Sequence, residues 1–89
     1  MIKHLVISGR VQGVGFRYWL QSLANKKNIF GWVKNTISGN VEALIVGDEK
    51  EVEDLIKLCK KGPISSKVDN VKVNEYKKDY FKKSFDIIK

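Results

Sequence analysis

A glycine-rich segment near the N-terminus constrains the fold of this chain more than any other feature of its sequence. Three of the seven glycines fall within the run Gly9–Gly15, GRVQGVG. Glycines at this density interrupt regular structure, so the run is predicted to be a loop. The preceding run, Ile2–Ser8, is rich in β-branched residues and predicts a strand. Apolar residues at helical spacing then predict a helix from Phe16 to about Lys27, ended by Asn28 in a left-handed cap.

The remaining elements follow from the same kinds of pattern. In chain order they are a strand at Ile29–Asn35, a turn around Ser38-Gly39, a strand at Val41–Val46, a helix starting at Asp48, a strand at Val68–Tyr76 and a short strand at Phe85–Ile88. Asp48 and Glu51 have capping-box spacing, and Gly62-Pro63 ends the second helix. The order β-α-β-β-α-β predicts an α+β, ferredoxin-like sandwich. It has one antiparallel sheet, both helices on one face and a short fifth edge strand.

This topology determines which segments are neighbours. Right-handed crossovers place the strands Ile2–Ser8 and Val41–Val46 in the middle of the sheet. The strands Ile2–Ser8 and Ile29–Asn35 then run parallel with one strand between them, so their C-terminal ends share one edge, about 10 Å apart. The glycine loop and Asn35 are therefore predicted to lie close together, and this edge is the expected functional site.

The charge of the chain is positive and unevenly distributed. The formal net charge is +7, and residues 1–41 contain six basic side chains and no acidic one. Such a balance favours anionic partners, including phosphates, nucleic acid and membrane surfaces. Only two of the basic residues are arginines, Arg10 and Arg17, and both lie at the glycine loop.

Arg17 is the most informative of these charged residues. A cation in the first turn of a helix opposes the helix dipole at a cost of about 0.3–1 kcal/mol, and broken local rules tend to mark functional sites. The loop N–H groups and the helix N-terminus together form an anion nest, and a guanidinium is a planar fork that suits phosphate. Asn35 can hold a water molecule, because its carboxamide both donates and accepts hydrogen bonds. Each feature also has a plainer interpretation: a tight turn, a solvated arginine and ordinary turn chemistry.

Several familiar kinds of site are excluded. The loop lacks the Gly-Lys-Ser/Thr of a Walker loop and the third glycine of a dinucleotide-binding fingerprint. The single cysteine, Cys59, excludes an intramolecular disulfide and a cysteine-cluster metal site, and it is expected in the core of the second helix. His4 is expected to be structural, and Ser8 has no evident base beside it. No stretch approaches the roughly 18 apolar residues of a membrane span, so a soluble, cytoplasmic protein is expected.

The scarcity of acid–base residues limits the reaction. Without a general acid the leaving group must depart unprotonated, and a carboxylate qualifies because its conjugate acid has a pKa of about 4. Without a strong base the attacking water has to be oriented rather than deprotonated in advance. Positioning and charge stabilisation are sufficient for phosphoryl transfer when the substrate is already activated. A mixed anhydride of phosphate and a carboxylic acid fits these limits.

Several motifs, taken in order, resemble the acylphosphatase family. They are GRVQGVGFR at Gly9–Arg17, GWVKN at Gly31–Asn35 and GNVE at Gly39–Glu42, with later landmarks at Lys61–Pro63 and Phe85–Ile87. The resemblance covers about Lys3 to Ile88. It implies a ferredoxin-like enzyme that hydrolyses acyl phosphates to a carboxylate and inorganic phosphate, without a metal or a cofactor. Asn28, Ser38 and Leu58 depart from the family pattern at positions that affect packing and stability rather than chemistry.

The same resemblance implies roles for individual residues. Arg17 and Asn35 are the implied catalytic residues: the arginine binds the phosphate, the asparagine orients the attacking water, and a substrate phosphate oxygen accepts its proton. The implied phosphate-binding loop acts through the backbone N–H groups of Arg10, Val11, Gln12, Gly13, Val14 and Gly15. The expected protein is one domain spanning residues 1–89, a monomer whose partner is a small-molecule acyl phosphate rather than nucleic acid or a membrane.

Two other functions stay open at this point. The element order and the charge also suit an RNA recognition motif, although that module needs stacking aromatic residues on its central strands and Val41–Val46 has none. Domains that resemble this chain act on carbamoyl phosphate inside larger maturation proteins. The chain lacks the rest of such a protein, which counts against that role. The lysine-rich stretch Lys77–Lys83 is expected to be a solvated loop.

Overall fold

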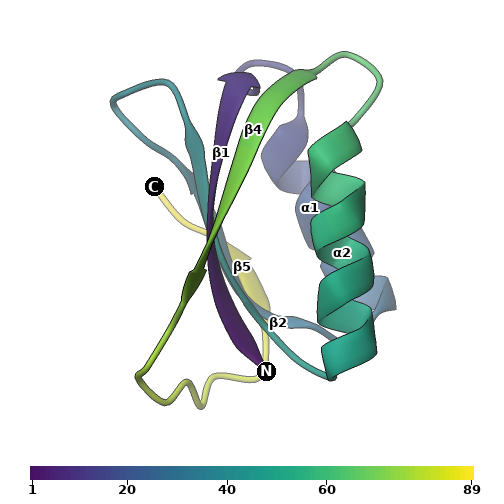
Figure 1. Ribbon diagram of the computed structural model, residues 1–89, viewed down its shortest axis with the longest axis vertical. Helices are drawn as coiled ribbons and strands as arrows, with labels where there is room; N and C mark the ends of the chain where they lie inside the picture. The colour runs from purple at the N-terminus through teal and green to yellow at the C-terminus, as the bar shows by residue number, and fades with distance from the viewer.

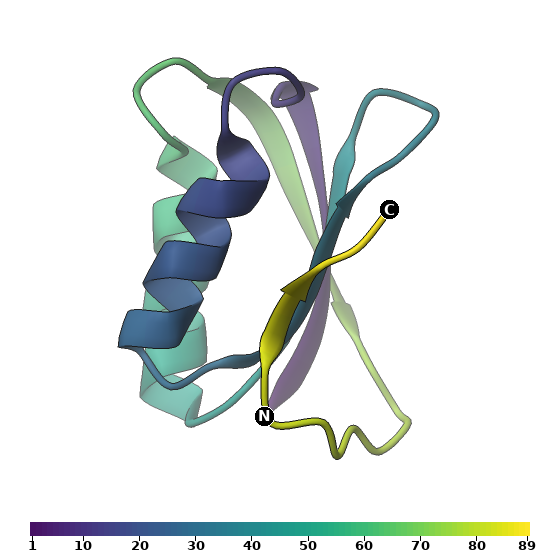
Figure 2. The same ribbon diagram turned by 180° about the vertical axis from the view of Figure 1, so that it is seen from behind.

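The computed structural model describes residues 1–89. In chain order its elements are β1 (Ile2–Arg10), α1 (Phe16–Lys26), β2 (Phe30–Asn35), β3 (Val41–Val46), α2 (Glu49–Lys61), β4 (Lys67–Glu75) and β5 (Phe85–Ile87). The predicted order of elements is confirmed, with ends that differ by one or two residues. Figure 1 and Figure 2 show both helices on one face of the sheet, which leaves the other face without a covering layer.

The sheet has the strand order β4-β1-β3-β2-β5, with β1 and β3 inside it as predicted. Strand β3 pairs antiparallel with both β1 and β2, so β1 and β2 run in the same direction. The ferredoxin-like α+β fold is confirmed, but the sheet is mixed rather than wholly antiparallel, because β5 pairs parallel with β2. The reason is visible in Figure 1: β4 finishes at the end of the molecule where β2 begins, and the chain crosses there to start β5.

The core lies between the sheet and the two helices. Its fifteen buried residues are Leu5, Ile7, Val11, Phe16, Leu20, Ala24, Ile29, Val33, Val41, Ala43, Ile45, Val52, Leu55, Cys59 and Phe85. Burying a large apolar side chain stabilises the fold by about 1.5–3 kcal/mol, so both helices are held firmly against the sheet. Because Val11 and Phe16 belong to this core, the glycine loop between them is anchored at both ends.

The helix ends follow local chemistry. Asn28 has a φ of 55°, the left-handed conformation predicted for it, and the Ile29 N–H donates to the Ala24 carbonyl over 2.8 Å. Asp48 occupies the N-cap position of α2, but its side chain makes no capping hydrogen bond, so the predicted capping box is not formed. The acidic first turn of α2 favours the helix dipole instead. Neither helix combines the length and the apolar character needed to cross a bilayer.

Candidate functional site

A cavity of about 140 Å³ lies where the loop after β1, the first turn of α1 and the end of β2 meet. The residues that line it are Val11, Gly13, Gly15, Phe16, Arg17, Tyr18 and Asn35. The glycine loop and Asn35 are neighbours because β1 and β2 end at the same edge of the sheet. Their predicted proximity is thereby confirmed.

The cavity brings together most, but not all, of the residues predicted for the site. Arg10, Gln12 and Val14 do not line it. Arg10 is exposed at the end of β1, where it pairs in register with Lys67 of β4. Val14 packs against the core, and the Gln12 side chain turns toward the β2–β3 hairpin. The backbone groups of Gln12 and Val14 remain part of the loop that borders the cavity, whereas Arg10 belongs to β1.

The loop presents unpaired backbone donors. Gly13 and Gly15 adopt left-handed φ angles of 73° and 78°, which residues with a Cβ atom rarely adopt. None of the N–H groups of residues 11–15 donates a hydrogen bond within the protein. Helix α1 starts directly after them, with no side-chain cap and no acidic residue in its first turn. Free N–H groups next to the positive end of a helix dipole favour the binding of an anion.

Arg17 adds a full positive charge to this arrangement. Its side chain is partly buried, and none of the five ion pairs of the protein includes it. No carboxylate lines the cavity to neutralise it. A guanidinium presents a planar set of donors that matches a phosphate in a bidentate manner. The cavity therefore suits a phosphoryl group.

Asn35 supplies an acceptor that the protein leaves unused. It is the last residue of β2, opposite Val41 of β3. Its Oδ1 atom is buried without a hydrogen-bond partner, and it is the only buried side-chain nitrogen or oxygen of which this is true. Such an atom costs about 1–3 kcal/mol unless a donor reaches it. Asn35 therefore keeps unused hydrogen-bonding capacity at the cavity that it lines.

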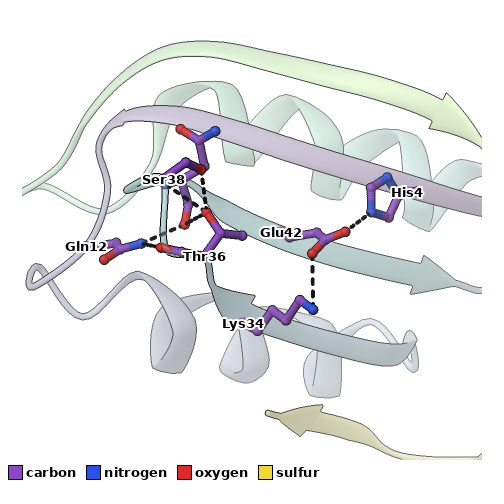
Figure 3. A network of polar contacts seen from close by, with 7 residues as sticks. His4, Gln12, Lys34, Thr36, Ser38 and Glu42 are labelled. Carbon is purple, nitrogen blue, oxygen red and sulfur yellow. Dashed lines mark hydrogen bonds and ion pairs between the residues drawn. The ribbon is translucent and has the colours of Figure 1, made fainter. Parts of the chain in front are cut away.

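The turn after Asn35 is held rigidly by polar contacts (Figure 3). The Thr36 N–H donates to the Asn40 carbonyl over 2.9 Å, and the Thr36 Oγ1 lies 2.9 Å from the Ser38 Oγ. The Gln12 Nε2 donates to the carbonyl oxygens of Thr36 and Asn40 over 2.7 and 2.8 Å. The loop after β1 and the turn after β2 are thus joined by one side chain.

A second polar cluster lies on the uncovered face of the sheet, also drawn in Figure 3. The His4 Nε2 lies 2.6 Å from the Glu42 carboxylate and donates to it, and the Lys34 Nζ lies 3.4 Å from the same carboxylate. Burial acts to raise the pKa of Glu42, but the His4 hydrogen bond and the Lys34 charge together bring it below its ordinary value. His4 is accordingly engaged in structural contacts, and Glu42 is poorly suited to act as a proton donor.

The structure also identifies residues that the sequence did not assign to the site. Tyr18 and Phe16 line the cavity, and Tyr18 is largely exposed at 69%. The Gln12 side chain is not predicted from the sequence, because the glycine loop indicates a role only for its backbone. Its sequence signal is that it is the one polar side chain between Val11 and Gly15. No group of three or more His, Cys, Asp or Glu side chains is placed to hold a metal ion.

Comparison with known proteins places this geometry in a family. The acylphosphatase family model matches residues 3–87. An acylphosphatase of Acidiphilium cryptum is 46% identical over 69 residues, which are 78% of this chain and 76% of that protein. The acylphosphatase of Bacillus subtilis superposes with a TM-score of 0.93 at 38% identity over the whole of both chains. Full-length HypF, in its phosphate- and nucleotide-bound form, matches at a TM-score of 0.86 and 31% identity, over 99% of this chain and 12% of HypF. The chain belongs to the acylphosphatase family.

Proposed function

We propose that this protein is an acylphosphatase in which the cavity beside Arg17 binds the phosphoryl group and Asn35 holds the attacking water. Membership of the family supports hydrolysis of acyl phosphates. The observation that carries the mechanism is that Asn35, whose Oδ1 has no hydrogen-bond partner in the protein, lines the same cavity as Arg17. Arg17 can bind the negatively charged phosphoryl group, and Asn35 can hold the attacking water. Hydrolysis of a phosphoryl compound requires both.

The phosphoryl group is bound by charge and by backbone donors. Its oxygens accept hydrogen bonds from the free N–H groups of residues 11–15 and from the Arg17 guanidinium. The negative charge of the transition state is spread over these oxygens, so donors already in place around them stabilise it. The backbone donors are fixed by the loop conformation and need no reorganisation during the reaction.

The attacking water is oriented by Asn35. The carboxamide of Asn35 holds the water by a hydrogen bond and leaves an oxygen lone pair of the water directed at phosphorus. The new bond joins the water oxygen to phosphorus, and the bond between phosphorus and the acyl oxygen breaks. The electron pair of that bond leaves with the carboxylate, and a phosphoryl oxygen takes up one proton of the water. The products are a carboxylate and dihydrogen phosphate.

The leaving group sets the substrate class. No carboxylate or imidazole lines the cavity, and the nearby Glu42 is held ionised by His4 and Lys34. A carboxylate leaves without protonation because its conjugate acid has a pKa of about 4, whereas an alkoxide requires a proton donor. Acyl phosphates are therefore substrates, and alkyl phosphate monoesters are not.

The experiment compares two substrates and three proteins. Purified wild-type protein should release phosphate from benzoyl phosphate and leave glycerol phosphate intact. Asn35→Ala should lower kcat for benzoyl phosphate by about 100-fold or more, the effect expected for losing a positioned reactant. Asn25→Ala, at an exposed asparagine of α1, is the matched control and should behave as wild type. Equal turnover of both substrates would contradict the leaving-group argument, and full activity of Asn35→Ala would contradict the water-holding role.

A further inference from the structure

We propose that Gln12 is a positioning residue, which fixes the distance between the phosphate loop and Asn35 by joining the loop to the β2–β3 turn. The inference rests on the proposed function, since it concerns how the two halves of that site are held together. It adds a role for a side chain that does not itself line the cavity.

The two hydrogen bonds of Gln12 are well defined. Its Nε2 donates to the Thr36 carbonyl over 2.7 Å and to the Asn40 carbonyl over 2.8 Å. Both partners are carbonyl oxygens, which only accept, so the NH₂ end of the carboxamide must face them. The two hydrogens of that NH₂ group are both used, which holds the side chain at a single position relative to the turn.

The sheet itself does not supply this link. The pairing of β1 with β3 ends at Ile7 and Val41, and the last residues of β1 pair only with β4, as far as Arg10 with Lys67. No other hydrogen bond or ion pair joins residues 11–15 to residues 36–40. Gln12 is therefore the only polar connection between the phosphate loop and the turn that follows Asn35.

The position of the contacted carbonyls makes the link relevant to the reaction. Thr36 directly follows Asn35, and the Asn40 carbonyl also accepts the Thr36 N–H over 2.9 Å, which closes the turn. The Oδ1 of Asn35 has no hydrogen-bond partner in the protein. The position of the Asn35 side chain therefore depends on the backbone on either side of the residue. Displacing a reacting group by about 1 Å costs on the order of 100-fold in rate.

If Gln12 positions Asn35, its loss should lower kcat without weakening the binding of phosphate. Gln12→Met keeps the length of the side chain but removes both donors, while the backbone N–H groups and Arg17 remain. Binding of inorganic phosphate should then change by less than about twofold. The value of kcat for benzoyl phosphate should fall by about 10- to 100-fold, because the water is no longer aligned with phosphorus. Gln12→Glu should lose as much activity as Gln12→Met, because a carboxylate cannot donate to two carbonyls.

The decisive measurement is a double-mutant cycle with Asn35. If Gln12 acts through Asn35, Gln12→Met should cost no further activity in an Asn35→Ala background. The matched control is Gln21→Met, since Gln21 makes one hydrogen bond of the same type, to the Phe85 carbonyl over 2.9 Å, away from the cavity. Thermal unfolding of each variant verifies that it is folded.

Two kinetic outcomes would overturn the proposal: a kcat loss that persists undiminished in the Asn35→Ala background, or a rise in the Kd for phosphate that accounts for the whole effect. A readout that needs no turnover separates this proposal from the proposed function. Phosphate should shift the NMR signals of the Asn35 side-chain amide in the wild type, and less so in Gln12→Met. Equal shifts in both proteins would reject the role of Gln12 whatever their activities, whereas an active Asn35→Ala variant would reject the water-holding mechanism itself.

Discussion

Arg17, in the first turn of α1, and Asn35, at the end of β2, line the same cavity, one with an unpaired cation and the other with an unpaired buried oxygen. Both features are unfavourable in the free protein. Unsatisfied groups of this kind lower stability, and their presence together is explained by a ligand that satisfies both. In the proposed mechanism, an acyl phosphate and its attacking water satisfy both.

Arg17→Lys should lose at least about 100-fold in kcat/KM for benzoyl phosphate. Lysine keeps the charge but replaces a planar two-pronged donor by a point charge. The measurement is phosphate release under conditions where substrate is limiting. Lys26→Ala, at the exposed last turn of the same helix, removes a charge far from the cavity and should change kcat/KM by less than about twofold. Wild-type turnover by Arg17→Lys would show that charge alone is sufficient.

Gly31→Ala should destabilise the protein by about 3 kcal/mol or more. Gly31 has a φ of 135°, and a Cβ there would lie within 1.9 Å of the Leu44 carbonyl oxygen across the sheet. Gly39→Ala is the matched comparison: its φ is also positive, at 93°, but no atom lies within 4 Å of the added Cβ. The strain there is about 1–2 kcal/mol. Urea unfolding measures both, and equal losses would contradict the steric argument.

Glu42→Gln should change the response of stability to acid. The pKa of Glu42 lies below its ordinary value of 4.5, because the His4 hydrogen bond and Lys34 outweigh the effect of burial. A lowered pKa means that the ionised group stabilises the fold above about pH 4.5, and that this contribution is lost as the pH falls through the lowered value.

Thermal unfolding between pH 7 and pH 2.5 tests this expectation. The Tm of the wild type should exceed that of Glu42→Gln at neutral pH, and the two values should converge in acid. A constant difference across the whole range would mean that the charge of Glu42 contributes nothing.

Cys59 should be unreactive in the folded protein. Its side chain is fully buried, and burial raises the pKa of the thiol to about 12. The thiolate is the reactive form, so an aromatic disulfide reagent at pH 8 should label Cys59 only when the chain unfolds. The labelling rate should therefore rise with urea in step with unfolding. Rapid labelling without denaturant would indicate local opening of α2.

Most of the fold could be predicted from the sequence because its signals are local. The glycines around Gly13 and the left-handed Asn28 mark chain reversals, and the alternation of apolar residues gives the strands. The direction of β5 could not be predicted, because it depends on which edge of the sheet the chain reaches after β4. The capping box at Asp48 was wrong because matching residue types do not fix a side-chain rotamer.

The location of the candidate site was predictable from the sequence, but its geometry was not. Topology alone places the loop beside Asn35. The orphaned Oδ1 of Asn35 and the two bonds of Gln12 depend on distances between segments that are remote in sequence, and no periodicity encodes them.

Every residue that lines the cavity falls between Val11 and Asn35. The second half of the chain contributes a helix and two strands to the framework, but no group to the cavity. In a saturation mutagenesis library, substitutions after β3 would therefore change the amount of folded enzyme in the cell. Substitutions before β3 would also change the turnover rate of each enzyme molecule. Abundance can thus be improved through the second half of the chain without touching the residues that line the cavity.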